Sequence, residues 1–196
     1  MKSSIKKFSV ITLIAILVLA MGILSGCGNK DIPANSDEDA TPVEGISKLD
    51  TVDVNGNHVD MNIFKDKKLT LVNVFSTNCG PCMGELPELA DLSKELKDSD
   101  KGVVAVLLDT NANGKPDKSA GETAKGSLGS KAENLTIIYP DSNMQDTILS
   151  GVTSIPYSFF VNSEGKMVGQ PYVGARSLDQ WKSIMDDVYK NMKSEK

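Results

Sequence analysis

An apolar run followed at once by two closely spaced cysteines limits the fold of this chain more than any other feature. The run from Leu69 to Phe75 is rich in β-branched and aromatic side chains and is short enough for a buried strand. Three polar residues follow, and the sequence CGPC, from Cys79 to Cys82, then begins a segment with helical character. The sequence therefore predicts a strand, a short loop and a helix that carries both cysteines in its first turn.

The position of the two cysteines favours redox chemistry. A helix N-terminus carries roughly +0.5 of an elementary charge and several unpaired N–H groups, and both favour a thiolate over a thiol. The thiolate is the nucleophile in disulfide exchange. We therefore expect Cys79, as the more exposed cysteine, to attack a disulfide and Cys82 to resolve the mixed disulfide.

Two other uses of a CxxC pair stay open. One is half of a zinc site, which needs about four ligands, usually from a second cysteine pair or two histidines. The chain has one other cysteine, Cys27, and one histidine, His58, so zinc is disfavoured and no metal ligand is assigned. His58 follows a predicted turn and is interpreted as a surface residue. The other use is a purely structural disulfide.

The first 26 residues have the pattern of a secretory leader. Three lysines fall within the first seven residues, and an almost uninterrupted apolar run extends from residue 8 to residue 24. The segment Leu24-Ser25-Gly26-Cys27 resembles the bacterial lipobox, which implies cleavage of residues 1–26 and a lipid on Cys27. An uncleaved transmembrane anchor is the alternative, because the apolar run is just below the usual spanning length. Both place the folded part at the extracytoplasmic face of the cell membrane.

The rest of the chain divides into a tether and one folded domain. Residues 27–45 are polar and acidic without apolar periodicity, which predicts a disordered tether. Residues 46–196 form the domain, which we expect to be a monomer. The whole chain has 21 basic and 26 acidic residues, a net charge of −5, and no basic patch. Nucleic acid is therefore not an expected partner.

Alternating strands and helices are predicted along the domain. Asn55-Gly56 lies between two short runs, 46–54 and 57–61, and indicates a β-hairpin. A helix is predicted at 83–97, and the apolar run at 102–108 predicts a second strand parallel to the first. The remaining expected elements are a strand at 135–139, a helix at 142–149, strands at 157–161 and 167–173, and a helix at 178–192.

The segment 110–134 is rich in Gly, Lys, Ser and Asn, and it predicts a solvated loop with a short helix. Its beginning, from Asp109 to Gly114, resembles the first half of a calcium loop. The twelfth position of such a loop, where a Glu should supply two oxygens, is Ala120, and the nearest carboxylate is Glu122. Calcium binding at 109–117 is therefore disfavoured, and the role of the segment stays open.

The order of elements resembles the thioredoxin fold of the membrane-anchored TlpA/ResA group of thiol–disulfide oxidoreductases. The resemblance covers about residues 46–193 and depends on VNVF before CGPC, on ELP after it, and on GVTSIP leading to Phe159. It implies an α/β fold with a central mixed β-sheet, flanking helices and an N-terminal β-hairpin extension.

The resemblance also implies roles for single residues. The bond between Ile155 and Pro156 is expected to be cis, with the proline against the disulfide and the Ile155 backbone free to pair with a substrate strand. Glu85, three residues after Cys82, matches the carboxylate of the membrane-anchored group, which we expect to exchange a proton with the resolving thiol. The alternative for Glu85 is a first-turn residue that only stabilises the helix dipole.

Two positions depart from the family pattern. Thioredoxins carry a buried Asp where this chain has Asn73, and relatives carry Trp where this chain has Asn78, immediately before the first cysteine. The second departure removes a flat aromatic surface beside the attacking sulfur. The resemblance therefore says little about how this chain contacts its substrate.

The expected function is that of a lipid-anchored disulfide reductase without a cofactor. The dipeptide between the cysteines is that of thioredoxin, whose potential is about −270 mV. The resemblance implies electrons from a membrane thiol carrier of the CcdA/DsbD type and substrates among oxidised exported proteins, for example apocytochrome c. The sequence selects no substrate, no donor and no direction of electron flow.

Two alternative functions belong to other classes of protein. The first is a thiol peroxidase, which shares the fold. Its active-site pattern is matched by Ser76, three residues before Cys79, and by the one arginine, Arg176. The proline of that pattern is missing, because Val72 occupies its position. A non-enzymatic lipoprotein would bind a metal or an exported partner through Cys79 and Cys82. Both are less favoured than the reductase.

Overall fold

The computed structural model describes residues 45–194. The predicted leader, the lipidation site at Cys27 and nearly all of the predicted tether lie outside the described residues, so these stay predictions. Among the described helices, none combines the length and the apolar composition that crossing a bilayer requires.

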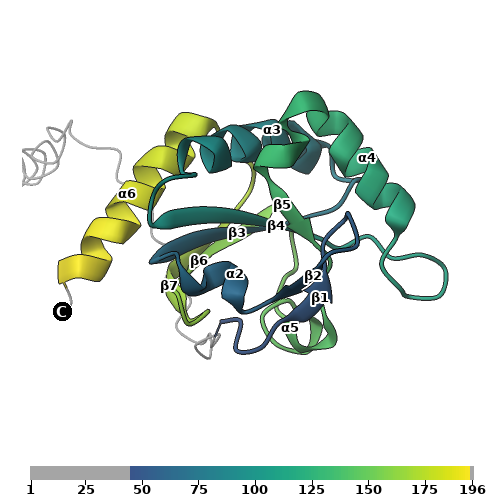
Figure 1. Cartoon of the computed structure of the whole chain (residues 1–196), viewed down its shortest axis with the longest axis horizontal. Helices are drawn as coiled ribbons and strands as arrows, with labels where there is room; N and C mark the ends of the chain where they lie inside the picture. The colour runs from purple at the N-terminus through teal and green to yellow at the C-terminus, as the bar shows by residue number, and fades with distance from the viewer. Residues whose placement is uncertain (1–44, 195–196) are drawn as a thin grey trace, which may run out of the picture. The chain divides into compact units, whose positions relative to one another are not determined.

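A five-stranded mixed sheet in the order β5-β4-β3-β6-β7 forms the centre of the domain (Figure 1). The predicted strand before the cysteines is the central one, and all seven of its residues are buried, as expected for a strand covered on both faces. β4 and β5 run parallel to it on one side, while β6 runs antiparallel to it and β7 antiparallel to β6. The strands are β3 (Leu69–Phe75), β4 (Lys101–Leu107), β5 (Thr136–Ile138), β6 (Tyr157–Val161) and β7 (Met167–Val173).

Helices and the hairpin cover the two faces of this sheet. Figure 1 shows α3, α4 and α6 on one face, and α2, α5 and the hairpin on the other. Alternate residues of β3 enter the two cores, with Leu71 facing the α3 side and Val72 facing the α2 side. The helices are α2 (Asn62–Lys65), α3 (Gly80–Glu95), α4 (Lys118–Leu128), α5 (Ser142–Asp146) and α6 (Leu178–Ser194), with a 3₁₀ helix η1 (Gly129–Asn134) after α4.

The predicted hairpin is confirmed, with shorter strands than the apolar runs suggested. β1 (Asp50–Val52) pairs antiparallel with β2 (His58–Asp60), and Gly56 in the turn has φ +88°, a conformation that glycine adopts without strain. His58 is exposed, and its Nε2 lies 2.9 Å from Asp50 Oδ1 across the hairpin. The interpretation of His58 as a surface residue is therefore confirmed. The short helix α2 was not predicted, and it places Phe64 in the core.

The cysteine-bearing helix α3 begins at Gly80, within the CGPC motif, which confirms the predicted helix start. Cys79 is its N-cap residue, and a proline follows within the first two helical positions, where its missing N–H costs no hydrogen bond. The buried leucines recur at helical spacing, so that one face of the helix packs on the sheet. These are Leu86, Leu89 and Leu92.

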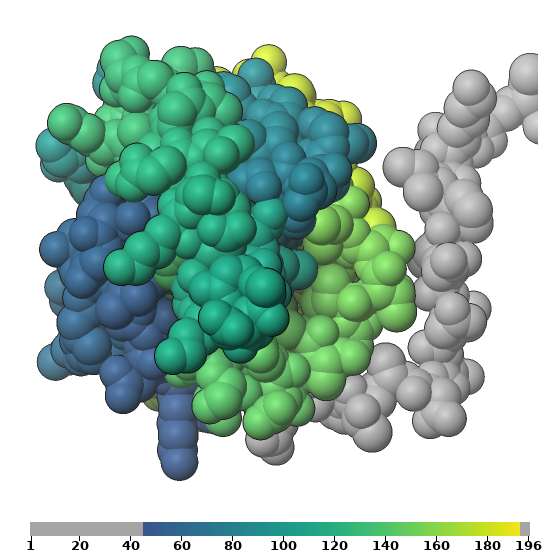
Figure 2. Space-filling view, turned by 90° about the vertical axis from the view of Figure 1, so that its right-hand side faces the viewer, coloured from purple at the N-terminus to yellow at the C-terminus, as the bar shows by residue number. Residues whose placement is uncertain are grey.

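The prediction for 110–134 was wrong in extent, because most of the segment is regular structure. The eleven-residue helix α4 packs through a stripe of mostly small residues, and a Cβ at Gly121 would clash with the Tyr139 hydroxyl. Small side chains allow this close approach but give only a weak apolar pattern, so the sequence indicated a short helix without its bounds or length. Figure 2 shows α4 and the loop before it (teal to green) on the surface beside the hairpin (blue). The buried residues of α4 are Ala120, Gly121, Ala124 and Leu128.

The described segment carries a complete core of its own. Its buried apolar residues extend from Ile46 to Met185 and form one cluster on each face of the sheet. Trp181 of α6 is fully buried and meets the rings of Phe160 and Tyr172 edge-on at 6.4 and 5.9 Å. The chain from Gly45 onward therefore suffices for a folded domain.

Replacing a leucine at the interface between α3 and the sheet tests this packing. Leu89 has no exposed surface, so Leu89→Ala should lower the free energy of unfolding by about 2–5 kcal/mol in urea titrations. The control is Val52→Ala in the hairpin, where 40% of the residue is exposed and the loss should be below about 0.5 kcal/mol. Equal losses in the two variants would contradict the assignment of the core.

Candidate active site

The two cysteines form a disulfide across the first turn of α3. Cys79 has an extended backbone as the N-cap residue, and its Sγ accepts a hydrogen bond from the Cys82 N–H at 3.2 Å. Cys79 is partly exposed, whereas Cys82 is buried. This difference in exposure is what the predicted roles of attacking and resolving cysteine require.

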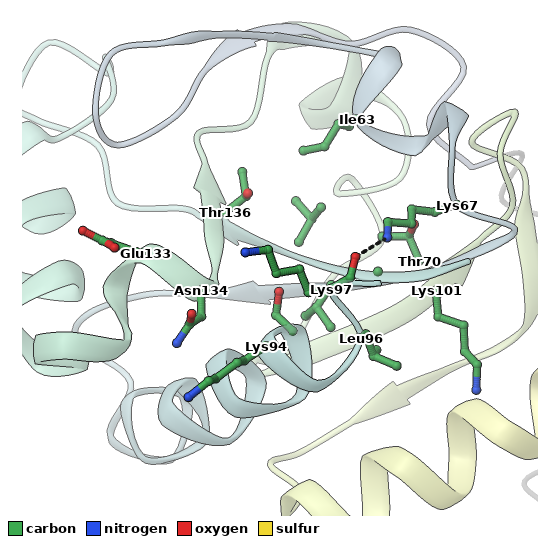
Figure 3. A pocket seen from close by; sticks show the side chains of 14 residues that line it. Ile63, Lys67, Thr70, Lys94, Leu96, Lys97, Lys101, Glu133, Asn134 and Thr136 are labelled. Carbon is green, nitrogen blue, oxygen red and sulfur yellow. Dashed lines mark hydrogen bonds between the residues drawn. The ribbon is translucent and has the colours of Figure 1, made fainter. Parts of the chain in front are cut away.

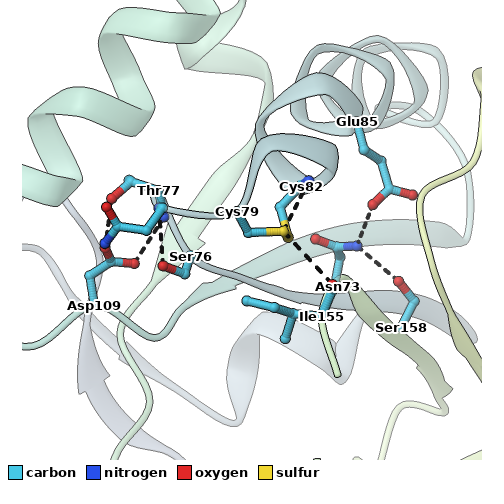
Figure 4. Close-up of a disulfide and its surroundings, with 10 residues drawn as sticks. Asn73, Ser76, Thr77, Cys79, Cys82, Glu85, Asp109, Ile155 and Ser158 are labelled. Atoms are coloured by element: carbon cyan, nitrogen blue, oxygen red, sulfur yellow. Dashed lines mark hydrogen bonds between the residues drawn. A yellow bond between two sulfur atoms is a disulfide. The ribbon is translucent and has the colours of Figure 1, made fainter. Parts of the chain in front are cut away.

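The predicted cis-proline segment lies against the disulfide. The peptide bond between Ile155 and Pro156 is cis, which confirms the expectation from the resemblance. The Sγ of Cys79 lies 3.8 Å from the carbonyl oxygen of Ile155 (Figure 4). An oxidised sulfur carries no hydrogen, so this contact becomes an S–H···O hydrogen bond only when Cys79 is reduced to the thiol.

Strand topology explains why these segments meet. β3 leads into the cysteine loop at its carboxyl end, and β6 leaves the cis-proline segment at its amino end. The two strands pair antiparallel with Val74 opposite Tyr157, so both ends lie at the same edge of the sheet. Residues 76 positions apart, Cys79 and Ile155, are thereby brought into contact.

Glu85 lies buried on the next turn of α3 after Cys82, with 1% of its surface exposed. Its Oε1 accepts hydrogen bonds from the backbone N–H of Arg176 at 2.9 Å and from the indole Nε1 of Trp181 at 2.8 Å. Its Oε2 accepts one from the Asn73 amide at 3.1 Å. Burial raises the pKa of the Glu85 carboxyl above its ordinary value, and these N–H donors lower it only in part.

Asn73 links this carboxyl group to the sheet, a role that the sequence did not reveal. Its amide nitrogen donates both to Glu85 and to the hydroxyl oxygen of Ser158 on β6, at 2.9 Å, as Figure 4 shows. The signal available in the sequence was an amide inside an otherwise apolar strand. Trp181 lies in the helix predicted at 178–192, and the available signal was that a buried indole N–H needs an acceptor.

Arg176 is engaged with aromatic rings and backbone carbonyls. Its guanidinium carbon lies 5.1 Å from the ring centres of both Tyr172 and Trp181, and Nη1 donates to the Gly174 carbonyl at 2.7 Å. Only its backbone N–H reaches the Glu85 carboxylate. The peroxidase alternative therefore receives no support from this arginine.

The carboxylate of Asp109 contacts the loop before Cys79. It accepts hydrogen bonds from the Thr77 N–H at 3.0 Å and from the Thr77 hydroxyl at 2.6 Å. The first residue of the calcium-like pattern is thus bonded to the cysteine loop. Asp117, the last residue of the 109–117 segment, caps α4 by accepting a hydrogen bond from the Ser119 N–H at 2.9 Å. Residues 45–194 contain no group of three or more His, Cys, Asp or Glu side chains that could hold a metal ion.

Two cavities lie away from the disulfide. One, of about 290 Å³, lies where β3 and β4 begin, and four lysines are among its lining residues (Figure 3). There Lys67 Nζ donates to the Ser99 carbonyl at 2.7 Å. The other, of about 650 Å³, lies between the hairpin turn and the start of α4. Neither is lined by a cysteine, so the redox chemistry is assigned to the surface around Cys79.

The raised pKa of Glu85 predicts a particular dependence of stability on pH. The folded state holds the Glu85 proton more tightly than the unfolded state, whose carboxyl has the ordinary pKa of 4.5. The stabilising contribution is therefore complete below pH 4.5 and is lost as the pH rises through the raised pKa. Urea titrations of wild type and Glu85→Gln between pH 4 and pH 8 should show the difference moving in favour of the variant as the pH increases. A difference that stays constant would contradict the raised pKa.

Comparisons with known proteins agree with this geometry. The sequence model of the family named Redoxin matches residues 28–177. The thiol:disulfide interchange protein CycY of Rhizobium leguminosarum bv. viciae is 35% identical over 101 residues, which cover 52% of this chain and 48% of CycY. The match thus spans about half the length of this curated relative.

Solved structures share the fold. The exposed lipoprotein thioredoxin Etrx1 of Streptococcus pneumoniae strain TIGR4 superposes with a TM-score of 0.58 at 21% identity, over 71% of this chain and 98% of Etrx1. A thioredoxin-family thiol:disulfide interchange protein of Chlorobium tepidum TLS gives 0.58 at 21% identity, over 76% of this chain and 98% of that protein. These likenesses confirm the predicted thioredoxin fold. Because the family match covers the cysteine pair, the cis-proline segment and most of the rest of the sequence, the chain belongs to the Redoxin family.

Proposed function

We propose that the chain is a thiol–disulfide oxidoreductase that acts by dithiol exchange through Cys79 and Cys82. The observation that carries the proposal is the placement of this disulfide. A partly exposed cysteine caps α3, a buried cysteine lies in the first helical turn, and the cis-proline segment contacts the exposed sulfur. The family match and the name of the relative CycY support the same chemistry.

The exchange proceeds in two balanced steps from the reduced form. The Cys79 thiolate, stabilised by the N-terminus of α3, attacks one sulfur of a substrate disulfide, so that one S–S bond breaks and a mixed disulfide forms. The released substrate thiolate takes up a proton. Cys82 then loses its proton and attacks the Cys79 sulfur, which releases the second substrate thiol. Two electrons and two protons pass to the substrate, and the Cys79–Cys82 disulfide remains.

Glu85 is proposed to accept the proton that Cys82 loses. Its position one turn along α3, its burial and its raised pKa support this role. The three N–H donors described above hold both carboxylate oxygens on the α3 side of the sheet. An exposed first-turn glutamate that only stabilises the helix dipole would lack this burial.

We further propose that the protein acts as a reductase at the membrane surface. The Gly80-Pro81 dipeptide supports the direction, and the lipobox pattern at Cys27 supports the lipid anchor and the extracytoplasmic location. The similar structure Etrx1 is itself described as an exposed lipoprotein. Electrons would then come from a membrane thiol carrier of the CcdA/DsbD type, and the substrates would be oxidised exported proteins, with apocytochrome c as one example.

Reduction of insulin tests the activity itself. The reduced segment from Gly45 to Lys196 should accelerate precipitation of the insulin B chain in dithiothreitol, because precipitation follows disulfide cleavage. Cys79→Ala should abolish the acceleration, and Cys82→Ala should accumulate a mixed disulfide that electrophoresis detects. Peroxide consumption without insulin reduction would instead favour the peroxidase.

The reduction potential tests the direction of electron flow. Equilibration of the same segment with glutathione or dithiothreitol buffers should give a potential at or below about −250 mV, as for a thioredoxin-like reductant. A value near −150 mV would overturn the reductase direction while leaving the exchange chemistry in place. The same cysteines would then form disulfides in exported proteins.

A further inference from the structure

The attacking cysteine is positioned by the loop of residues 76–78, which joins β3 to α3. Two hydrogen bonds close this loop on itself. The Cys79 N–H donates to the Ser76 carbonyl at 3.1 Å, and the Asn78 N–H donates to the Ser76 hydroxyl oxygen at 3.2 Å. These bonds set the shape of the turn but do not attach it to any other strand.

Asp109 supplies that attachment. It follows β4, which pairs parallel with β3, so both carboxyl ends lie at the same sheet edge. One carboxylate oxygen accepts from the Thr77 N–H at 3.0 Å and the other from the Thr77 hydroxyl at 2.6 Å, as Figure 4 shows. The Asn78 amide nitrogen lies 3.5 Å from the same carboxylate, too far for a strong hydrogen bond. A single side chain thus holds the backbone and the side chain of the residue two positions before Cys79.

The backbone of Asp109 is itself held in place. The preceding residue, Leu108, donates its N–H to the Phe75 carbonyl at 2.9 Å, which extends the ladder between β3 and β4. The Asp109 carbonyl accepts from the Asp117 N–H at 3.0 Å, at the start of α4. The carboxylate is therefore presented from a fixed backbone.

We propose that Asp109 is a positioning residue for disulfide exchange, acting through Thr77 on the attacking Cys79. The inference deepens the proposed function, because it concerns the same sulfur. Attack on a disulfide needs the thiolate aligned with the S–S bond, and small displacements of a reacting group cost large factors in rate. With Asn78 in place of a large aromatic residue before Cys79, the hydrogen bonds of Asp109 are those that tie this loop to a neighbouring strand in the described part of the chain.

The Asp109 carboxylate brings both acceptor oxygens and a negative charge to this loop. Orientation and charge can be separated by substitution. Asp109→Ala removes both, Asp109→Asn removes the charge but keeps one acceptor oxygen, and Thr77→Val removes the hydroxyl donor but keeps the charge.

The experiment compares two reactions of the reduced segment from Gly45 to Lys196. Reduction of insulin requires an aligned thiolate, whereas alkylation by neutral iodoacetamide requires only a thiolate. Both rate constants are divided by the fraction of Cys79 present as thiolate. For Asp109→Ala, the corrected rate constant for insulin reduction should fall about tenfold, whereas the corrected rate constant for alkylation should change less than about twofold. Thr77→Val should show a smaller fall in the same ratio. The pH dependence of alkylation, measured for each variant, supplies the thiolate fraction used in this correction.

The matched control is the side chain of Asp117, which caps α4 and has no hydrogen bond to Thr77. Asp117 reaches Asp109 only through its backbone N–H, which the substitutions leave in place. Asp117→Ala and Asp117→Asn should leave the ratio of the two rate constants at the wild-type value. An unchanged ratio for Asp109→Ala, or an equal change for Asp117→Ala, would overturn the positioning role. Should the wild type alkylate normally but reduce no insulin, the proposed function fails. The positioning role alone fails if the wild type reduces insulin and Asp109→Ala leaves the ratio of the two rate constants unchanged.

Discussion

The central strand β3 is the element on which the rest of the structure depends. It pairs with β4 on one edge and with β6 on the other, and all seven of its residues are buried. Such a strand has no freedom to shift its register, because a slip by one residue would exchange the two faces that pack into the two cores. The position of the cysteine loop is therefore fixed where it leaves the carboxyl end of β3.

The sheet edge beyond β3 collects residues from three segments with different directions. The cysteine loop follows β3, Asp109 follows the parallel strand β4, and the cis-proline segment precedes the antiparallel strand β6. A mixed sheet thus brings two strand ends and one strand beginning to the same place. This arrangement lets the partly exposed sulfur of Cys79 contact the backbone of the cis-proline segment while its partner Cys82 stays buried within α3.

Behind the disulfide, the structure keeps an ionisable carboxyl in an apolar core. The cost of removing Glu85 from water is offset in part by N–H groups from Asn73, Arg176 and Trp181, and the balance leaves its pKa raised. Phe160 and Tyr172 pack edge-on against Trp181 in this region. The Arg176 guanidinium lies over the rings of Tyr172 and Trp181. This environment supports the proposed transfer of a proton from Cys82 to Glu85.

The sequence by itself determined the elements with strong local signals. Apolar periodicity indicated β3, β4 and α6, Asn55-Gly56 indicated the hairpin, and the CGPC motif indicated a redox pair at a helix start, while the resemblance supplied the cis bond before Pro156. The bounds and length of α4 were not predicted, because its packing face is built mostly from alanine and glycine, whose burial leaves little pattern. Only the tertiary structure decided that Asn73 and Trp181 hold Glu85 and that Asp109 holds Thr77. Those partners lie 12, 96 and 32 residues apart, and they meet because strand register and helix docking place them together, which no local pattern encodes.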